Sequence, residues 1–391
     1  MRLCPPKGAT SHLFYLQKMV ERTFTFIVTE ACQLKCKYCY LIGKNNAHKM
    51  SFDIAKKAAD FILLEETFQK ADKVIFDFIG GEPLLEIELI SFIMDYLISR
   101  MTTLKHKWLY NYEIRLTTNG LLYDSMPVQQ FIQMYKEHLS ISISIDGTKE
   151  KNDKNRIFSN GDGSYDQVVR NVHLWIHQFP NAGTKMTISH EDVPYVFESL
   201  KHLVELGIKT IDVNPVVENV WMKEDGPKFQ AQLIDFADYI IDNNIWKSLQ
   251  ITAFHEFLGH PLDSMEKMAP CGTMSLSIDA EGNLYSCIRF AVYSLRTKHP
   301  LCIGNINEGL NLNKVRAINT IYNDVVSPKR CLECDYASGC KWCPAESFDC
   351  SDIGTVNIRT TYNCEMHKAK VKAKNYYINK LKSIGVYYDR Y

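Results

Sequence analysis

TFTFIVTEACQLKCKYC, residues 23–39, joins a strand pattern to a group of three cysteines. Thr23–Val28 contains only β-branched and aromatic residues, which predicts a buried strand. Cys32, Cys36 and Cys39 follow in the spacing C-x3-C-x2-C. We therefore expect a loop that carries three thiols at the end of the first strand.

The same strand pattern returns along the first 215 residues and alternates with helical patterns. Alternating strands and helices predict parallel pairing through right-handed crossovers. Six such units predict an α/β fold with a partial (β/α)6, TIM-like barrel, whose sites lie at the C-terminal ends of the strands. The further candidate strands are Lys73–Ile79, Tyr112–Thr118, Leu139–Ile145, Thr184–Ile188 and Thr210–Asn214. The candidate helices are Phe52–Thr67, Ile87–Met101, Met126–Glu137, Tyr165–Gln178 and Tyr195–Leu206.

Composition narrows the class of protein. The chain has 391 residues, and its 45 basic and 45 acidic residues leave no net field that favours nucleic acid or an anionic membrane. The sequence contains no apolar run of about 18 residues, so no membrane span is predicted. Residues 1–17 lack the pattern of a secretory signal. We therefore expect a cytoplasmic location. Of the 13 cysteines, nine follow residue 270, and in a reducing compartment such thiols bind metal or do chemistry.

The spacing of the first three cysteines suits an iron–sulfur cluster with one open iron. Three thiolates in one loop can hold three corners of a four-iron cluster, whereas full protein ligation needs four cysteines. The remaining iron can then bind a small molecule. Tyr38 places an aromatic ring beside Cys39. A zinc site or three unrelated thiols are the alternatives for this triplet taken alone.

The motif C-x3-C-x-aromatic-C after the first strand of a partial barrel resembles the radical S-adenosylmethionine (SAM) superfamily. The resemblance implies that the amino and carboxylate groups of SAM chelate the open iron. It also implies that one electron, supplied by a flavodoxin or ferredoxin, cleaves the sulfonium. The resulting 5′-deoxyadenosyl radical takes a hydrogen atom from the substrate.

Other strand ends resemble motifs of the same superfamily. Residues 80–83 resemble its GGEP motif, in which glycine allows the backbone to approach the SAM amino group. Residues 117–120 match TTNG, and residues 142–147 match S-x-D-G, which faces the methionyl and ribose parts of SAM. Residues 152–156 stand where relatives carry H-D-x-x-R, but the histidine is absent. The residues implied to bind SAM are Tyr38, Gly80, Gly81, Glu82, Pro83, Thr118, Asn119, Ser144, Asp146, Arg156 and Asn214.

The cysteines after residue 270 resemble the SPASM domain, which holds auxiliary clusters in peptide-modifying relatives. Cys271-x10-Gly282-x4-Cys287 fits the first half of its pattern, while the quartet Cys331 to Cys343 has one residue fewer than the family spacing. The resemblance implies three [4Fe-4S] clusters in total. A zinc ribbon is the alternative. The implied distal ligands are Cys331, Cys334, Cys340 and Cys364, and the implied proximal ones are Cys271, Cys287 and Cys343, with Cys350, Cys302 or an open position as the fourth.

These resemblances divide the chain into four parts. We expect an N-terminal leader (1–21), a radical SAM partial barrel (22–225), a helical bridge (226–265) and a small Cys-rich α+β SPASM domain with a C-terminal helix (266–391). We expect the bridge to be helical over Phe229–Trp246. The last helix, His367–Ile384, is expected to present a solvated charged face.

The local sequence after Cys287 favours one activity. Sulfatase-maturating relatives, which make formylglycine, carry an acid there that serves as a base, whereas this chain has Ile288. Cys287–Phe290 looks more like maturases of the ranthipeptide and sactipeptide type, which join a Cys sulfur to a carbon in a thioether. The implied partner is a Cys-rich peptide with a leader. Formylglycine formation remains an alternative, and a noncatalytic iron–sulfur carrier or zinc scaffold is an alternative of another class.

Overall fold

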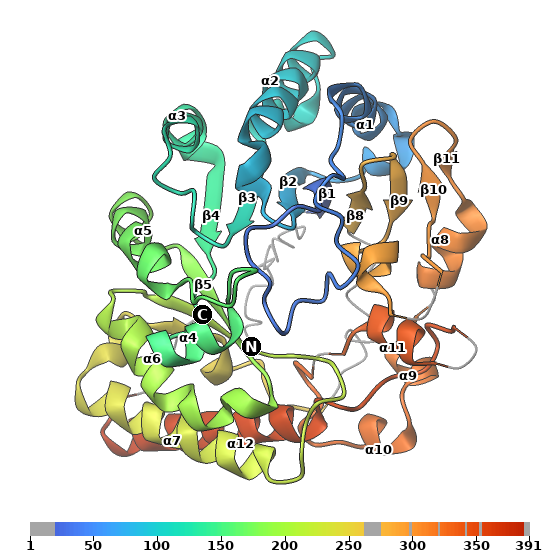
Figure 1. Ribbon diagram of the computed structural model, residues 1–391. Coiled ribbons are helices and arrows are strands. Elements are labelled where there is room, and N and C mark those ends of the chain that lie inside the picture. The colour runs from blue at the N-terminus through green and yellow to red at the C-terminus, as the bar shows by residue number, and fades with distance from the viewer. Residues whose placement is uncertain are drawn as a thin grey trace, which may run out of the picture.

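Parallel strands surrounded by helices form the body of the computed structural model, as Figure 1 shows. The structure describes residues 20–261, 275–296, 299–319, 321–340, 342–351 and 354–386. The predicted α/β partial barrel is confirmed. The parallel strands are β1 (Glu21–Thr29), β2 (Lys73–Gly80), β3 (Tyr112–Thr118), β4 (Leu139–Ile143), β5 (Gly183–Ile188) and β6 (Thr210–Pro215).

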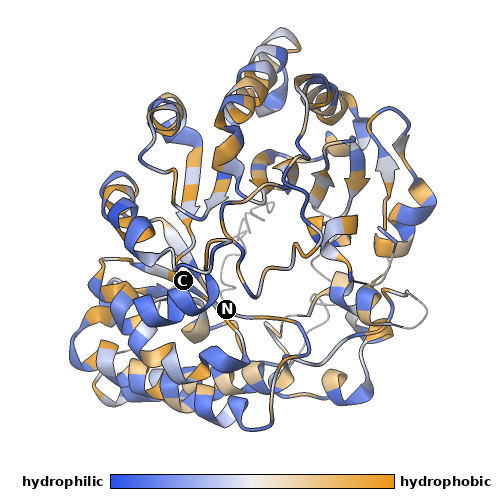
Figure 2. Cartoon of the chain, viewed as in Figure 1, coloured by the Kyte–Doolittle hydropathy of each residue, from blue (hydrophilic) through white to orange (hydrophobic). Residues whose placement is uncertain are grey.

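The helices between these strands pack on the outside of the barrel. Figure 2 shows them striped with hydrophilic and hydrophobic residues, as expected for helices that bury one face on a sheet. Each lies close to its predicted range, and α5 coincides with it. They are α1 (Phe52–Leu64), α2 (Ile87–Thr103), α3 (Met126–Tyr135), α5 (Tyr165–Gln178) and α6 (Val196–Glu205), while the short α4 (Lys149–Asn155) lies between β4 and α5.

The barrel consists of two hydrogen-bonded sheets that meet between β4 and β5. β1 to β4 pair in sequence order, whereas β5, β6 and β7 (Gln250–Ile251) form a second sheet. Where β4 meets β5, the buried Thr184 hydroxyl donates to the carbonyl of Ile143 at 2.7 Å and accepts from the amide of Ile145 at 3.2 Å. Thr184 therefore supplies hydrogen bonds where the backbone ladder is missing.

The C-terminal region extends the barrel sheet instead of forming a separate one. β8 (Ser275–Ile278) pairs parallel with β1 on the side opposite β2. Three short antiparallel strands follow, so one sheet runs across the boundary expected near residue 266. This pairing was not predicted from the sequence. These strands are β9 (Asn283–Tyr285), β10 (Gly304–Asn305) and β11 (Gly309–Leu310).

The last helix corrects one prediction. α12 (Cys364–Ser383) packs along α7 (Asp225–Asp242), which begins and ends four residues before its predicted range. Two lysines of α12 are buried and not solvated: Lys370 Nζ donates to the carbonyl of Val213 at 2.6 Å, and Lys374 Nζ to that of Leu258 at 2.9 Å. The basic side chains thus dock the helix on the barrel. The expectation of a solvated charged face holds for the exposed Lys372 and Lys382 but not for these two buried lysines.

The remaining helices are short and lie near the C-terminal cysteines. The helices are α8 (Leu312–Asn319), α9 (Asn323–Val326), α10 (Lys329–Leu332) and α11 (Pro344–Cys350), with single 3-10 turns at Pro83–Glu86, His190–Tyr195 and Ile288–Phe290 among others. Among the described residues, no helix is both long and apolar enough to cross a membrane.

The two faces of the main sheet differ in chemistry. Alternate residues of β1 and β2 place Phe24, Phe26, Phe76 and Phe78 in the core. Phe24 packs edge-on against Phe68 with ring centroids 5.0 Å apart, which shows that this face is the outer, helix-covered one. The side chains between these phenylalanines point to the inner face.

Candidate active site

The loop after β1 carries the three cysteines and is held against the segment after α4. Lys35 N donates to the carbonyl of Ile157 at 2.7 Å, and Lys37 N to that of Asn155 at 3.0 Å. The thiols of Cys32, Cys36 and Cys39 are partly exposed, unbridged by disulfides, and close enough to affect one another electrostatically. The structure therefore gathers the predicted triplet in one anchored loop.

Burial keeps two of these thiols protonated as long as no metal is bound. Burial raises the pKa of Cys36 to about 11, and the neighbouring thiols raise it further, whereas Arg156 lowers it. Burial also raises the pKa of Cys32. Bound metal removes the proton from such a thiol outright. The pKa shifts thus describe the thiols without metal.

Two glycines of the predicted GGEP loop allow the closest backbone approach in the site. A Cβ at Gly80 would stand 2.2 Å from the carbonyl oxygen of Thr29, and one at Gly81 would stand 2.2 Å from that of Ala31. Gly81 N also donates to the Thr29 carbonyl at 2.9 Å. Any side chain here would displace the start of the cysteine loop, so glycine is required for packing.

Glu82 joins the loops that follow β2 and β3. Its buried carboxylate accepts from the hydroxyl of Thr118 at 2.7 Å and from the amides of Asn119 at 2.7 Å and Leu84 at 3.1 Å. Burial raises the pKa of Glu82, and these hydrogen bonds oppose that effect. Pro83 begins the 3-10 turn that follows. The Glu82 carboxylate therefore accepts its hydrogen bonds from other groups of the protein.

The third and fourth loops reach the cysteine loop through short polar contacts. Asn119 Nδ2 donates to Gln33 Oε1 at 3.1 Å and lies 3.9 Å from Cys32 Sγ. Ser144 is half-buried just beyond β4, and its amide donates to the carbonyl of Thr118 at 2.9 Å. Asn119 and Ser144 thus stand at the C-terminal edge of the sheet, where the sequence placed them.

A buried charge network connects the cysteine loop to the fourth and fifth strands. Tyr38 donates to Asp146 Oδ2, and Arg156 Nη1 donates to the Tyr38 hydroxyl at 3.1 Å. Asp146 Oδ1 accepts from the amide of Thr187 at 3.0 Å. Burial, together with Asp146, raises the pKa of Tyr38, so the phenol stays protonated. Burial lowers the pKa of the Arg156 guanidinium, but the nearby Tyr38, Cys36 and Asp146 raise it by more, so the net shift is upward.

Arg156 retains an unused donor. Its Nε is buried without a hydrogen-bond partner in the described part of the chain. A buried unpaired donor is rare in folded proteins and points to a missing acceptor. A carboxylate satisfies a guanidinium best, because two parallel N–H groups can reach its two oxygens.

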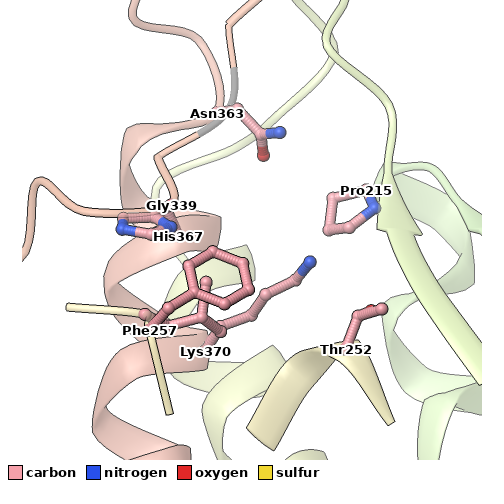
Figure 3. Close-up of a pocket in the computed structure, with 8 residues that line it drawn as sticks. Pro215, Thr252, Phe257, Gly339, Asn363, His367 and Lys370 are labelled. Atoms are coloured by element: carbon pink, nitrogen blue, oxygen red, sulfur yellow. The ribbon is translucent and has the colours of Figure 1, made fainter. Parts of the chain in front are cut away.

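Asn214 lies at the end of β6, one strand beyond the contact between Asp146 and Thr187. It is half-buried and pairs in register with Thr187 of β5. The next residue, Pro215, lines a cavity of about 80 Å³ shown in Figure 3, together with Lys370 and Asn363. Also in this cavity is His367, whose pKa is lowered by burial to about 4. The sequence analysis did not find this cavity, because α12 returns to β6 from the far end of the chain.

The distal set of C-terminal cysteines comes together. Cys340 interacts electrostatically with Cys364 and Cys331, and Cys364 interacts with Cys331 and Cys334. The cysteines come from α10, the turns after it and the N-terminus of α12. Arg359 Nη2 donates to the carbonyl of Cys340 at 3.2 Å and places a cation beside the group. The four residues implied as distal ligands therefore share one place in the fold.

The proximal set is partly described. Cys287 and Cys343 interact electrostatically, whereas Cys271 lies outside the described residues. Cys350 ends α11, about 10 Å along the helix axis from Cys343 at about 1.5 Å per residue, and its thiol donates to Glu346 at 3.3 Å. Cys302 donates to the carbonyl of Gly304 at 2.9 Å in a polar pocket beside β10. Both alternatives for the fourth ligand thus have protein partners.

The geometry bears on the choice between zinc and clusters. Within the described ranges, no three His, Cys, Asp or Glu side chains converge as a group that could hold a single metal ion. A zinc ion draws its thiolates to about 2.3 Å and hence close to one another. A four-iron cluster binds one thiolate at each corner and holds them farther apart. The spacing of the thiolates in the loaded protein would therefore distinguish zinc from a cluster.

Sequence reasoning missed several charged residues around the two cysteine regions. Arg289 lies over the Tyr40 ring, 4.9 Å from its centroid, and pairs with Glu218. His48 Nδ1 lies 2.7 Å from Glu30, and its other ring nitrogen contacts Glu281. Another charged residue that was not predicted is Asp77, the single acid within the otherwise mostly apolar strand β2. That break in an apolar run is a signal that the sequence did contain.

The comparisons with known proteins agree with this geometry. Residues 26–220 match the family model described as the radical SAM superfamily. An uncharacterized protein of Methanocaldococcus jannaschii is 30% identical over 47% of this chain, and the match spans 59% of that protein. A serine-type anaerobic sulfatase-maturating enzyme of Bacteroides thetaiotaomicron is 22% identical over 82% of each chain. A cysteine-type anaerobic sulfatase-maturating enzyme of Clostridium novyi is 29% identical over 37% of each chain.

Solved structures show the same fold over most of the chain. The structure of anSMEcpe with bound AdoMet and Kp18Cys peptide has a TM-score of 0.69 at 20% identity, covering 93% of this chain and 99% of that one. Streptococcus suis SuiB bound to precursor peptide SuiA has a TM-score of 0.56 at 15% identity, covering 88% of this chain and 76% of that one. At these identities the likeness concerns the fold.

Proposed function

We propose that this chain, an enzyme of the radical SAM family with its matching domain at residues 26–220, modifies a peptide or protein at a cysteine or serine side chain. The observation that carries the proposal is the convergence of the Cys32 loop with the buried Arg156 at the C-terminal edge of the sheet. The similar structures with peptide ligands and the sulfatase-maturating relatives support a polypeptide substrate.

The residues present fit a SAM-bound cluster. Cys32, Cys36 and Cys39 would hold three irons, and the unpaired Arg156 Nε suits a carboxylate such as that of SAM. The clusters and SAM, when bound, supply a 5′-deoxyadenosyl radical that takes a hydrogen atom from substrate, and they supply an electron acceptor. Tyr38 remains protonated and fixes the Arg156 guanidinium. The other residues proposed to surround SAM are Gly80, Gly81, Glu82, Pro83, Thr118, Asn119, Ser144, Asp146 and Asn214.

The auxiliary sites complete the proposal. The four distal cysteines would hold one cluster, and Cys271, Cys287 and Cys343 would hold another, for three [4Fe-4S] clusters in all. Arg289 pairs with Glu218 beside Cys343 and keeps a positive charge near the proximal site. We also propose a flavodoxin- or ferredoxin-type reductant, by analogy with the family, and a cytoplasmic location. The four-part domain division also remains our proposal.

Two products are open, and different observations favour them. Ile288 is buried in the core where sulfatase-maturating relatives carry an acid, which favours a thioether between a Cys sulfur and a carbon of a Cys-rich peptide. The match with a sulfatase-maturating enzyme over 82% of each chain favours formylglycine. Both reactions begin with loss of a hydrogen atom from carbon and of a proton from a thiol or hydroxyl.

Mass spectrometry distinguishes the two products. The reconstituted enzyme, SAM and a reductant are incubated with a cysteine peptide that carries a leader, or with a sulfatase-type Cys peptide. A loss of two hydrogens, with a sulfur that no longer alkylates, is the thioether result. Replacement of sulfur by oxygen with the same loss of hydrogens is the formylglycine result. SAM cleavage with neither peptide altered would contradict the proposed peptide-modifying activity for these substrate types.

A further inference from the structure

A row of polar side chains crosses the inner face of the barrel sheet. In register, Ser277 of β8 pairs with Thr25 of β1, Thr25 with Asp77 of β2, Asp77 with Arg115 of β3, and Arg115 with Ser140 of β4. Residues paired across strands point to the same face. Since the phenylalanines beside them face the outer helices, this row faces the barrel interior.

Asp77 is the only acid in this row, and its side chain is partly exposed. The Thr25 hydroxyl donates to Asp77 Oδ2 at 3.0 Å and orients the carboxylate. Asp77 is only half-buried, and Arg115 beside it is also partly exposed. Because both side chains point inward, this exposure is toward the barrel interior. The exposed part of the carboxylate is therefore on the face that a substrate in the barrel would meet.

Asp77 also lies between the two cysteine regions. Its charge acts on Tyr40, the residue after Cys39, and on Cys287 of the proximal auxiliary set. These residues belong to opposite regions of the proposed electron path, the SAM loop and the C-terminal domain. The carboxylate is therefore near the place where a substrate must lie to meet both a radical and an electron acceptor.

The charges around Asp77 suit a proton acceptor. Burial raises the pKa of Asp77 to about 6, while the Thr25 hydrogen bond and Arg115 limit the rise. The carboxyl is then mostly ionised at neutral pH, yet basic enough to take a proton. The titratable or charged groups coupled to Asp77 are Arg115 on β3, Tyr40 in the first loop and Cys287 in the C-terminal region. Arg115 in turn pairs with Glu113 on the same strand.

We propose that Asp77 is the catalytic base that receives the thiol or hydroxyl proton of the substrate side chain. The inference rests on the proposed function and deepens it. Ile288 occupies the position where sulfatase-maturating relatives carry their acid, and Asp77 supplies a carboxylate to the same region from β2. The step balances: one hydrogen atom goes to the 5′-deoxyadenosyl radical, one proton to Asp77, and one electron to an oxidised iron–sulfur cluster.

The test separates proton transfer from hydrogen abstraction. The peptide is the one that wild-type enzyme modifies, labelled with deuterium on the carbon that loses hydrogen. Asp77→Asn keeps an acceptor for Thr25 but cannot take a proton. We expect deuterium to enter 5′-deoxyadenosine as in wild type, whereas product formation falls by about 100-fold or more, the usual contribution of a general base. Asp77→Glu restores part of the product.

The pH profile provides a second readout in variants that keep Asp77. Product formation by wild type declines as pH falls through about 6, the pKa of the base. Thr25→Val removes a hydrogen bond that stabilises the carboxylate, so the decline moves to higher pH. Asp60→Asn is the matched control, since Asp60 lies outside the barrel and pairs with Arg100. It leaves both the product and the profile unchanged.

Each outcome decides between explanations. Product formation by Asp77→Asn at the wild-type rate, with an unchanged pH profile, overturns the proposal. Loss of deuterium transfer together with product also overturns it, because Asp77 would then position the substrate. Circular dichroism checks that Asp77→Asn folds, and the Thr25→Val profile tests the proposal if it does not. Failure of wild type on every peptide would instead count against the proposed function.

Discussion

Replacing Thr184 with valine tests how the two halves of the barrel are joined. Valine has nearly the same shape but no hydroxyl, so the carbonyl of Ile143 loses a donor and the amide of Ile145 loses an acceptor. Leaving a buried polar group unsatisfied costs about 1–3 kcal/mol. With two such groups and some relaxation, we expect the β4–β5 junction to lose about 2–4 kcal/mol.

Hydrogen–deuterium exchange of the reconstituted enzyme measures this loss locally. At about 1.4 kcal/mol per factor of ten, the amides of residues 139–147 should exchange about 30- to 800-fold faster in Thr184→Val. The matched control is Thr117→Val, because Thr117 is an exposed strand threonine and its loss costs within about 0.5 kcal/mol. Unchanged exchange in Thr184→Val would refute the claim that this hydroxyl joins the sheets.

Three further predictions concern other parts of the site. Gly81→Ala should prevent cluster assembly, measured as iron per chain, because the added Cβ would lie 2.2 and 2.5 Å from the carbonyl oxygens of Ala31 and Glu30. The control variant Gly226→Ala on α7 should bind a normal amount of iron. Normal iron in Gly81→Ala would contradict the close packing. The hydrogen bond to Glu30 raises the pKa of His48 in the folded protein. The pair therefore contributes its full stability below the unfolded pKa of about 6.5. This contribution is lost as the pH rises through the higher folded pKa. The melting temperature of wild type should therefore exceed that of His48→Gln at mildly acidic pH and equal it at alkaline pH. A difference in melting temperature that stays constant with pH would contradict this. Lys370→Met should destabilise the docking of α12 by about 1–3 kcal/mol, since the carbonyl of Val213 loses its donor; unchanged protection of α12 in hydrogen exchange would contradict it.

The barrel could be predicted from the sequence because its signals are local. Strands such as Tyr112–Thr118 alternate apolar with polar residues between loops, and the loop motifs follow them directly. The SAM motifs also lie in order along the chain, so their meeting at one edge follows from parallel pairing.

The parts that escaped prediction depend on contacts between distant segments. β8 is four residues long, and only its pairing with β1 across some 250 residues makes it part of the barrel sheet. The lysines of α12 look solvated in sequence, but the ends of Lys370 and Lys374 reach carbonyls more than 100 residues away. Asp77 was visible as an acid in an apolar strand, yet its meaning depends on the approach of Cys287.

Cleavage of SAM by the reduced protein tests the central claim most directly. The chain is reconstituted anaerobically with iron and sulfide, reduced, and supplied with SAM, and 5′-deoxyadenosine is quantified. We predict that wild type forms 5′-deoxyadenosine and methionine, whereas Cys36→Ala, which removes one thiol of the Cys32 loop, forms neither. Intact SAM in the presence of a fully reduced wild-type cluster would contradict the account.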